Sequence, residues 1–146
     1  MENWLERTQL LVGEDVIKIF SEFSVAVVGL GGVGAYAAEM LVRSGIGNIL
    51  ILDSDAVSIT NKNRQLLALE STLGHQKSEV MAQRLKDINP QLNLTVIDEY
   101  LTPENVEELL SPHKIDFLVD AIDTLSPKLA LISYCVNNKL PLISSM

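Results

Sequence analysis

The feature that most constrains the fold is a glycine cluster between an apolar run and an amphipathic segment. Residues 24–29 (SVAVVG) are rich in β-branched side chains and predict a buried strand. From Gly32 to Arg43 the apolar residues recur at the spacing of one helical face, and Gly45 supplies a stop signal. A chain that passes through GLGGVG (residues 29–34) from strand to helix must turn sharply there. This pattern predicts the first β–turn–α unit of a layered α/β fold.

The rest of the chain alternates between the same two kinds of segment. Further strands are predicted at residues 48–53, 92–97, 116–119 and 141–144, and further helices at 76–88, 102–110 and 126–138. The last two helices open on cap-and-proline signals, Thr102-Pro103 and Ser126-Pro127. Strands that alternate with helices form right-handed βαβ units, which give a parallel sheet covered on both faces. We therefore expect a doubly wound, mainly parallel Rossmann-like sheet with the strand order 3-2-1-4-5.

Length and composition indicate a single domain. The chain has 146 residues, of which 47% are hydrophobic and 21% charged, as in an ordinary globular protein. Residues 1–22 are predicted to form a helical lead-in to a Rossmann-like domain at 23–146. The last predicted strand is barely finished at Met146, which would expose a sheet edge. We therefore expect the domain to be incomplete at its C-terminal end and the chain to be the front part of a longer protein.

Charge and cysteine content exclude several classes of function. Eleven basic against nineteen acidic residues give a net charge of −8, so this chain alone is not expected to wrap a phosphate backbone, and DNA is not an expected partner. The single cysteine, Cys135, excludes an intramolecular disulfide and a cysteine-cluster zinc site, and predicts a packing residue in a reducing, cytoplasmic setting. The uncharged residues 23–38 are too few and too glycine-rich to span a membrane.

The glycine cluster lies where the phosphates of a nucleotide would bind. Glycines let the backbone approach a phosphate closely, and the following helix N-terminus adds unpaired N–H groups and partial positive charge. The glycines concerned are Gly29, Gly31, Gly32 and Gly34. Asp53 ends the second predicted strand, where a carboxylate accepts hydrogen bonds from ribose hydroxyls. This pattern favours nucleotide binding over a purely packing role for the glycines, but it does not distinguish NAD from ATP.

Charged residues farther along favour ATP. Lys77 falls in the first turn of a predicted helix, where a cation opposes the helix dipole by some tenths to about one kcal/mol, so work on a ligand is a candidate role. Taken alone, Lys77 or Arg64 would be an ordinary surface cation. Together with a glycine loop they suit adenylation, in which a carboxylate attacks the α-phosphorus of ATP and negative charge builds on the departing pyrophosphate. Asp123, which with Asp120 follows the fourth predicted strand, is a candidate Mg²⁺ ligand, and a loop-capping role is equally open.

Five short stretches stand in the order and spacing typical of the E1-like activating enzymes of the ThiF, MoeB and HesA type. They are GLGGVG, Asp53-Ser54-Asp55, Asn61-x-Asn63-Arg64-Gln65, Gly74-x-x-Lys77 and Ala121-Ile122-Asp123. The resemblance covers nearly the whole chain, from Arg7 to Met146. Within this family, residues 7–14, 120–132 and 141–146 resemble the branch of the tRNA threonylcarbamoyladenosine dehydratases more than the activators of sulfur-carrier proteins.

The resemblance implies roles for the candidate residues. Gly32 and its neighbours would lie against the phosphates of ATP, and Asp53 would hold the ribose. Arg64 and Lys77 would stabilise the reacting phosphates, while Asp123 would bind Mg²⁺. Further candidates around the nucleotide are Asp55, Asn61 and Gln65.

The resemblance also implies an activity and partners. The branch activates the threonyl carboxylate of threonylcarbamoyladenosine in tRNA as an acyl adenylate, which then closes a ring with net loss of water. Arg7 would reach across a homodimer into the ATP site of the partner, and tRNA would be contacted mostly by segments beyond residue 146. A sulfur-transfer protein is a further implied partner. Adenylation of a ubiquitin-like sulfur-carrier protein, an NAD-dependent dehydrogenase and a non-catalytic scaffold remain alternatives.

Overall fold

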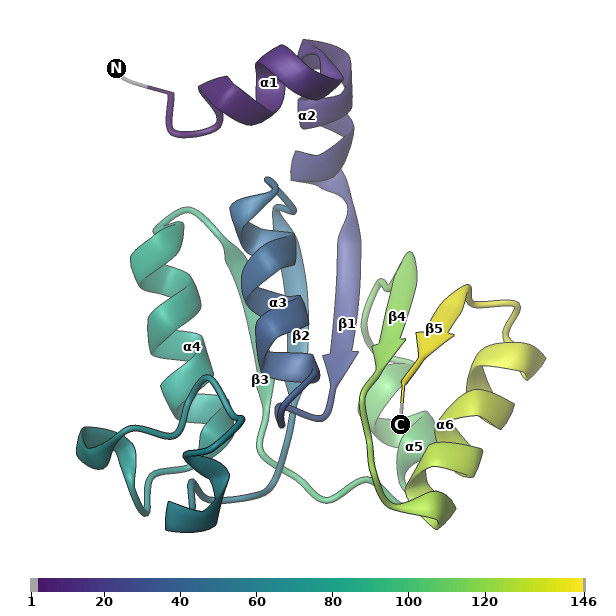
Figure 1. Ribbon diagram of the computed structural model, residues 1–146. Coiled ribbons are helices and arrows are strands. Elements are labelled where there is room, and N and C mark those ends of the chain that lie inside the picture. Colours follow the sequence, from purple (N-terminus) through teal and green to yellow (C-terminus); the bar gives the residue numbers. More distant parts are fainter. Residues whose placement is uncertain (1–2, 146) are drawn as a thin grey trace.

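A computed structural model describes residues 3–145 and shows a five-stranded parallel sheet (Figure 1). The strands are β1 (Ser24–Val28), β2 (Asn48–Leu52), β3 (Asn93–Ile97), β4 (Phe117–Asp120) and β5 (Leu142–Ser144). Their order in the sheet is β3-β2-β1-β4-β5. The last residue of β1, Val28, pairs with Leu52 on one side and with Asp120 on the other. The predicted fold class and strand order are confirmed.

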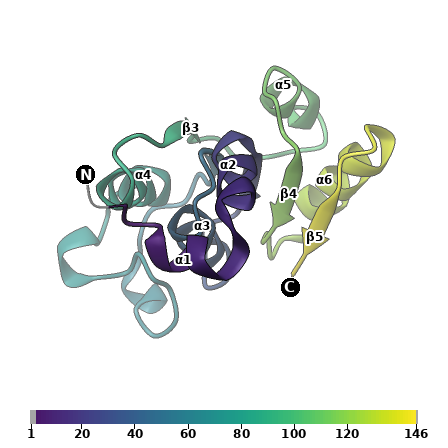
Figure 2. The ribbon, with the colours of Figure 1, turned by 90° about the horizontal axis from the view of Figure 1, so that it is seen from above.

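Helices cover both faces of the sheet (Figures 1 and 2). They are α3 (Gly34–Arg43) and α4 (Lys77–Ile88) on one face, and α5 (Val106–Leu110) and α6 (Leu125–Asn137) on the other. Each face of the sheet has its own hydrophobic core, the first under α3 and α4 and the second under α5 and α6. Because successive side chains of a strand point to opposite faces, Val27 of β1 lies in the first core and Val28 in the second. Cys135 is fully buried in the second core, as expected of a packing residue. Within residues 3–145, no helix is long and apolar enough to cross a membrane.

The N-terminal lead-in consists of two short helices. They are α1 (Glu6–Val12) and α2 (Glu14–Glu22), and they meet at Gly13, whose φ of 92° is accessible to glycine without steric cost. The side chain of Leu5 packs against Gly45, just beyond the C-terminal end of α3. The lead-in therefore lies at the amino-terminal ends of the strands, opposite the edge at which the glycine cluster lies (Figure 1).

The helix predicted from Thr102-Pro103 begins later than its sequence signal indicates. Residues 103–105 form a turn, and α5 starts only at Val106. The backbone N–H of Thr102 donates to Asn105 Oδ1 (2.7 Å), and the N–H of Asn105 donates to Thr102 Oγ1 (3.3 Å). This reciprocal pairing is that of a capping box, and the carbonyl oxygen of Thr102 accepts from the N–H of Val106 (3.1 Å). The predicted cap at Thr102 is therefore present, although the regular helix begins only at Val106.

Helix α4 begins one residue later than predicted, at Lys77 rather than Gln76, and two other helix starts also differ from the prediction. The first predicted helix begins at Gly34 rather than Gly32, because residues 31–33 form the turn of the glycine loop. Helix α6 begins at Leu125, ahead of the predicted cap at Ser126. Pro127 then falls within the first turn, where its missing N–H costs no helical hydrogen bond. In each case the helix exists and only its boundary was predicted wrongly.

The connection between β2 and α4 is long and irregular. It contains two 3₁₀ turns, η1 (Ile59–Asn61) and η2 (Glu70–Thr72). An isolated antiparallel bridge joins Ala56 to Gln76 and ties the two ends of the connection together. This bridge holds the segment after β2 beside the first turn of α4.

Candidate functional site

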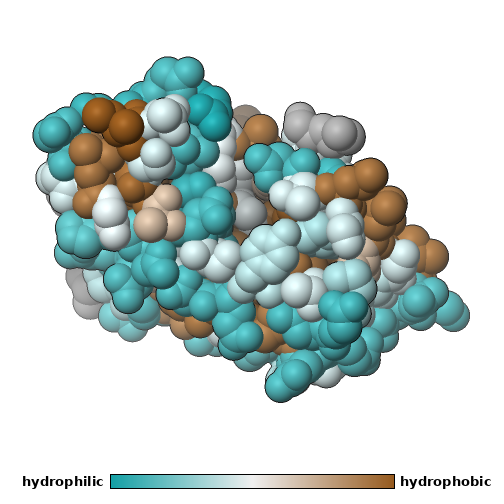
Figure 3. Space-filling model, turned by 90° about the horizontal axis from the view of Figure 1, so that it is seen from below, coloured by the Kyte–Doolittle hydropathy of each residue, from teal (hydrophilic) through white to brown (hydrophobic). Residues whose placement is uncertain are grey.

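A pocket of about 440 Å³ opens at the carboxyl ends of β1, β2 and β4. This is the point at which the strand order reverses, where open α/β sheets bind ligands. From this end the surface is mostly hydrophilic, with a recess between two raised lobes (Figure 3). The pocket brings together most of the predicted site residues, namely Gly29, Gly31, Gly32, Asp53, Asp55, Arg64, Gln65, Lys77 and Asp123.

The glycine loop is closed against the backbone of the β4–α6 connection. Gly29 has a φ of 92°, and a Cβ there would lie 2.7 Å from the carbonyl oxygen of Ala121. A Cβ on Gly34 would lie 1.7 Å from the carbonyl oxygen of Gly29. A Cβ on Gly31 or Gly32 would meet its nearest neighbours, in Gln65 and Arg64, only at ordinary contact distance. Gly29 and Gly34 therefore permit close backbone packing, whereas Gly31 and Gly32 leave the backbone of the loop open toward the pocket.

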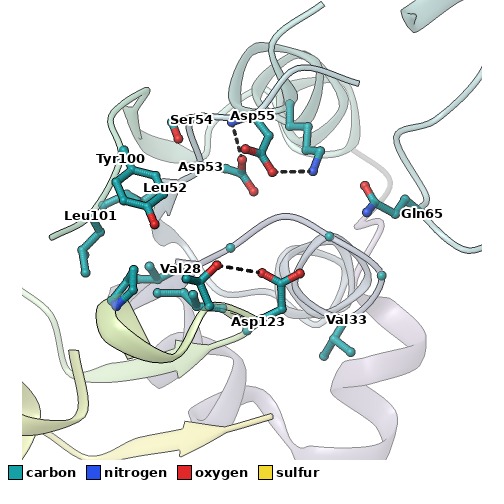
Figure 4. A pocket seen from close by; sticks show the side chains of 18 of the residues that line it. Val28, Val33, Leu52, Asp53, Ser54, Asp55, Gln65, Tyr100, Leu101 and Asp123 are labelled. Carbon is teal, nitrogen blue, oxygen red and sulfur yellow. Dashed lines mark hydrogen bonds and ion pairs between the residues drawn. The ribbon is translucent and has the colours of Figure 1, made fainter. Parts of the chain in front are cut away.

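Asp53 joins the glycine loop to the segment after β2, and it lies in the upper part of the pocket in Figure 4. Its Oδ2 accepts a hydrogen bond from the N–H of Leu30 (2.6 Å), and its Oδ1 accepts one from the N–H of Asp55 (2.8 Å). The residue is only 9% exposed, and this burial raises the pKa of its carboxyl against the lowering effect of the two hydrogen bonds. Each oxygen retains a lone pair for a ribose hydroxyl. Asp53 thus holds the glycine loop in place and also faces the pocket.

Lys77 places an ammonium group inside the pocket. Its side chain is 6% exposed, and its Nζ lies 3.1 Å from Oδ2 of Asp55, whose side chain is 68% exposed. The backbone N–H of Lys77 also donates to the carbonyl oxygen of Asp55 (2.9 Å). The first turn of α4 is therefore fixed to the segment after β2, and the cation that opposes the helix dipole has a carboxylate partner.

Arg64 and Gln65 approach the glycine loop from the long β2–α4 connection. The Cγ of Arg64 is 3.5 Å from the place where a Cβ of Gly32 would lie, and its Nη1 donates to the carbonyl oxygen of Thr60 (3.1 Å). Gln65 Nε2 is 3.6 Å from the corresponding position of Gly31. The exposed guanidinium of Arg64 therefore lies beside the backbone groups that a phosphate would approach.

Asp123 lies across the pocket from Asp53 and Asp55 (Figure 4). It is exposed, and its Oδ1 accepts a hydrogen bond from Thr124 Oγ1 (3.4 Å). Among residues 3–145 no group of three or more His, Cys, Asp or Glu side chains could hold a metal ion. Mg²⁺ usually binds through one or two carboxylates, substrate phosphates and water. A single carboxylate facing a phosphate loop fits that donor set, and it does not fit a metal held by protein ligands alone.

Three predicted site residues lie outside the pocket. Asn61 Oδ1 accepts from the N–H of Ser58 (2.9 Å) and caps the turn η1. Gly34 lies behind the loop, where it permits helix–strand packing. Arg7 is exposed on α1, at the opposite edge of the sheet from the pocket of its own chain (Figure 1).

The residues at the far end of the pocket carry no sequence motif and were not among the predicted site residues. Tyr100 and Leu101 follow β3 and line the pocket on the side away from Gln65 (Figure 4). Their aromatic and aliphatic surfaces suit the flat ring of a base. Their position after a predicted strand could have indicated them, because the carboxyl ends of all parallel strands meet at one edge of the sheet.

Fold and site together define the class of protein. A Rossmann-like sheet carries a glycine loop at its switch point, with an arginine, a buried lysine and three aspartates facing the same pocket. This is a nucleotide-binding α/β domain. The ThiF family model matches residues 5–146, and the chain belongs to the ThiF family.

Curated relatives include two bacterial tRNA threonylcarbamoyladenosine dehydratases. The protein from Escherichia coli K12 is 46% identical over 145 residues, with 97% of this chain and 54% of the relative covered. The protein from Bacillus subtilis 168 is 42% identical, with 100% of this chain and 57% of the relative covered. The chain thus spans about half the length of these relatives. The E. coli molybdopterin-synthase adenylyltransferase is more distant, at 33% identity over 90% of this chain and 51% of that protein.

Solved structures of a tRNA threonylcarbamoyladenosine dehydratase are also similar to this chain. A crystal structure of the E. coli dehydratase matches with a TM-score of 0.94 and 45% identity, covering 97% of this chain and 58% of that chain. A structure of the same E. coli enzyme in complex with ATP matches with a TM-score of 0.92 and 46% identity, covering 94% and 56% of the two chains.

Proposed function

We propose that the full-length protein is a tRNA threonylcarbamoyladenosine dehydratase that uses ATP. The observation that carries this proposal is the presence of two cations, Lys77 and Arg64, in the same pocket as the glycine loop. A dinucleotide site needs no such pair, whereas adenylation builds negative charge on a leaving pyrophosphate. The similarity to dehydratases at 46% and 42% identity supports the same substrate class.

The proposed reaction has two steps. In the first, a threonyl carboxylate oxygen bonds to the α-phosphorus of ATP, and the bond from that phosphorus to the bridging oxygen of pyrophosphate breaks. In the second, a neighbouring group of the same carbamoyl side chain attacks the activated carbonyl carbon, and AMP leaves with the former carboxylate oxygen. For the nucleoside, the net change is ring closure with loss of the elements of water, because the oxygen leaves in AMP and the attacking group gives up its proton to solvent. The second step needs no enzyme thiol, because the attacking group is already tethered at high effective concentration.

Each pocket wall has a proposed part in this chemistry. The open backbone at Gly31 and Gly32 would bind the phosphates, and Asp53 would orient the ribose. Lys77 and Arg64 would stabilise the charge on the departing pyrophosphate. Asp123 would hold Mg²⁺, which supplies further charge neutralisation when bound to the phosphates.

We propose that the enzyme acts as a homodimer in which Arg7 enters the ATP site of the partner. Support comes from the position of α1, which keeps Arg7 away from the pocket of its own chain (Figure 1). Exposed apolar side chains on and beside α1 and α3 are suited to contact with a second copy, and they are Leu10, Leu11, Val33, Tyr36 and Met40. A tRNA substrate also implies that the enzyme works in the cytoplasm.

The proposed function is tested with full-length protein, ATP and two tRNA preparations, one with and one without threonylcarbamoyladenosine. We expect pyrophosphate release only with the modified tRNA, and loss of one water from the nucleoside by mass spectrometry. Release that ignores the threonylcarbamoyl group but responds to a small carrier protein would instead identify a sulfur-carrier activator. Binding of NAD in preference to ATP would identify a dehydrogenase.

A further inference from the structure

A buried ion pair lies next to the pocket, outside the set of residues already assigned to the chemistry. Lys128, in the first turn of α6, is 5% exposed, and Asp120, the last residue of β4, is fully buried. Lys128 Nζ donates to Asp120 Oδ2 at 2.6 Å. Removal of two charges from water costs several kcal/mol per ion, so apolar side chains of similar volume would fill this position at lower free-energy cost.

The pair connects three structural elements. Asp120 Oδ2 also accepts from Ser144 Oγ of β5 (2.7 Å), and Asp120 Oδ1 accepts from the N–H of Ile122 (3.1 Å). Lys128 Nζ additionally donates to the carbonyl oxygen of Ser145 (2.8 Å). The two side chains thus link α6 to the ends of β4 and β5 and to the first residues of the β4–α6 connection.

The groups held by this pair belong to the wall of the pocket. Ile122, Asp123 and Ser145 all line it. The neighbouring carbonyl of Ala121 lies directly against Gly29, where a Cβ would be 2.7 Å away. A shift of residues 121–124 would therefore move Asp123 and also change the packing of the glycine loop.

We propose that Lys128 is a positioning residue, which with Asp120 fixes the β4–α6 connection so that Asp123 faces the phosphates of ATP. This inference rests on the proposed function for its kinetic consequence. The structure offers a comparison in Glu39, which pairs with Arg84 to tie α3 to α4. Neither partner of that second pair lines the pocket.

The test uses the full-length protein and three variants. Lys128→Met keeps the aliphatic stem and removes the charge. The double variant Lys128→Met with Asp120→Asn removes both charges, and its asparagine still accepts from the N–H of Ile122, so it guards against simple unfolding. Arg84→Met is the matched control, since it breaks a partly buried ion pair away from the pocket.

Two readouts are measured on each variant. Hydrogen–deuterium exchange, which needs no activity, reports on the amides of residues 121–124. ATP–pyrophosphate exchange, measured in the presence of tRNA that carries threonylcarbamoyladenosine, reports on catalysis as a function of ATP and Mg²⁺. In both Lys128 variants we expect at least tenfold faster amide exchange at 121–124, at least a tenfold lower kcat and a raised Mg²⁺ requirement. The KM for ATP should change by a smaller factor than kcat, because Asp53 still holds the glycine loop through the N–H of Leu30 even when residues 121–124 pack against that loop less closely.

The possible outcomes separate this inference from the proposed function. Amide exchange at 121–124 equal to that of the unmodified protein, or kinetic changes no larger than those of Arg84→Met, would overturn the positioning role. An unmodified protein without pyrophosphate exchange would refute the proposed function, and amide exchange would still decide whether Lys128 fixes the connection.

Discussion

Two lysines 15 positions apart, Lys62 in the β2–α4 connection and Lys77 at the start of α4, make different contacts. Lys77 is buried in the pocket beside Asp55, whereas Lys62 pairs with the exposed Glu70 at 2.6 Å and does not line the pocket. We predict that Lys77→Ala lowers the rate of ATP–pyrophosphate exchange by about 10²-fold or more, because a fixed cation facing developing charge is lost. Arg64→Ala should have an effect of the same order.

The matched control for this prediction is Lys62→Ala, which removes an equal charge from the connection that leads into α4. Its exposed ion pair contributes little to stability, so its exchange rate should stay within about twofold of the unmodified protein. Equal losses in Lys62→Ala and Lys77→Ala would show that net charge matters and that the pocket position does not.

Cys135 offers a test by pH. Burial raises the pKa of its thiol from 9.0 to about 11. Because the folded-state pKa is raised, this group stabilises the native state fully below pH 9, and that contribution is lost as the pH rises toward 11. At pH 8 the thiolate population is on the order of 10²-fold smaller in the folded than in the unfolded chain, and alkylation should slow at least as much.

The measurement is iodoacetamide labelling at pH 8 with and without urea, followed by mass spectrometry. Rapid labelling of the folded protein would contradict a buried packing role. A cysteine that reacts at its unfolded rate would instead indicate an accessible nucleophile.

The role of a single residue was predictable where that residue is unfavourable for the local structure in which the sequence places it. Lys77 was noticed because a cation in a first helical turn opposes the dipole, and the structure places it in the pocket. The pair between Lys128 and Asp120 was not found in advance, because it depends on how α6 packs against two strands. Asn61 was predicted to lie near the nucleotide, but its side chain instead caps the turn η1, which the sequence pattern did not reveal.

The turn from β1 to α3 makes different demands on its glycines. Gly34→Ala would force a Cβ to within 1.7 Å of the carbonyl oxygen of Gly29, whereas Gly31→Ala meets nothing closer than 3.6 Å. We predict that Gly34→Ala destabilises the fold by about 3 kcal/mol or more, because backbone must move. Gly31→Ala should leave stability nearly unchanged and weaken nucleotide binding, since a methyl group would then project from backbone that lines the pocket.

Thermal unfolding with and without ATP distinguishes the two variants. Gly34→Ala should unfold at lower temperature even without ligand. Gly31→Ala should keep the unfolding temperature of the free protein and lose the increase that ATP gives. The reverse pattern would show that the packing and binding roles of the loop are wrongly assigned.

Among secondary-structure elements, existence was predictable and boundaries were less so. Continuous apolar runs located all five strands, and one-sided helical periods located α3 and α4. Cap-and-proline signals located α5 and α6, and every one of these elements lies within a few residues of its predicted position. For α5 the sequence identified the cap at Thr102, whose reciprocal hydrogen bonds with Asn105 are present, but not that residues 103–105 form a turn before the regular helix begins. The division of the lead-in at Gly13 was missed because it depends on a positive φ, which the sequence permits but does not dictate.

The arrangement of the whole molecule separates Arg7 from the chemistry of its own chain. The sheet lies between α1, beyond the amino ends of the strands, and the pocket at their carboxyl ends (Figure 1). The packing of Leu5 against Gly45 holds the start of the lead-in at that far end. If Arg7 contributes to an ATP site, that site therefore belongs to another copy of the chain.

This geometry predicts complementation between two inactive variants. Arg7→Ala and Arg64→Ala should each lose most activity as full-length homodimers. After the two proteins are mixed, unfolded and refolded together, about half of the dimers are mixed, and in each of these one site combines Arg64 from one subunit with Arg7 from its partner. About a quarter of all sites then carry both arginines, so activity should recover to about a quarter of the unmodified level. No recovery in a mixture whose mixed dimers are confirmed by native mass spectrometry would show that Arg7 does not act across the interface.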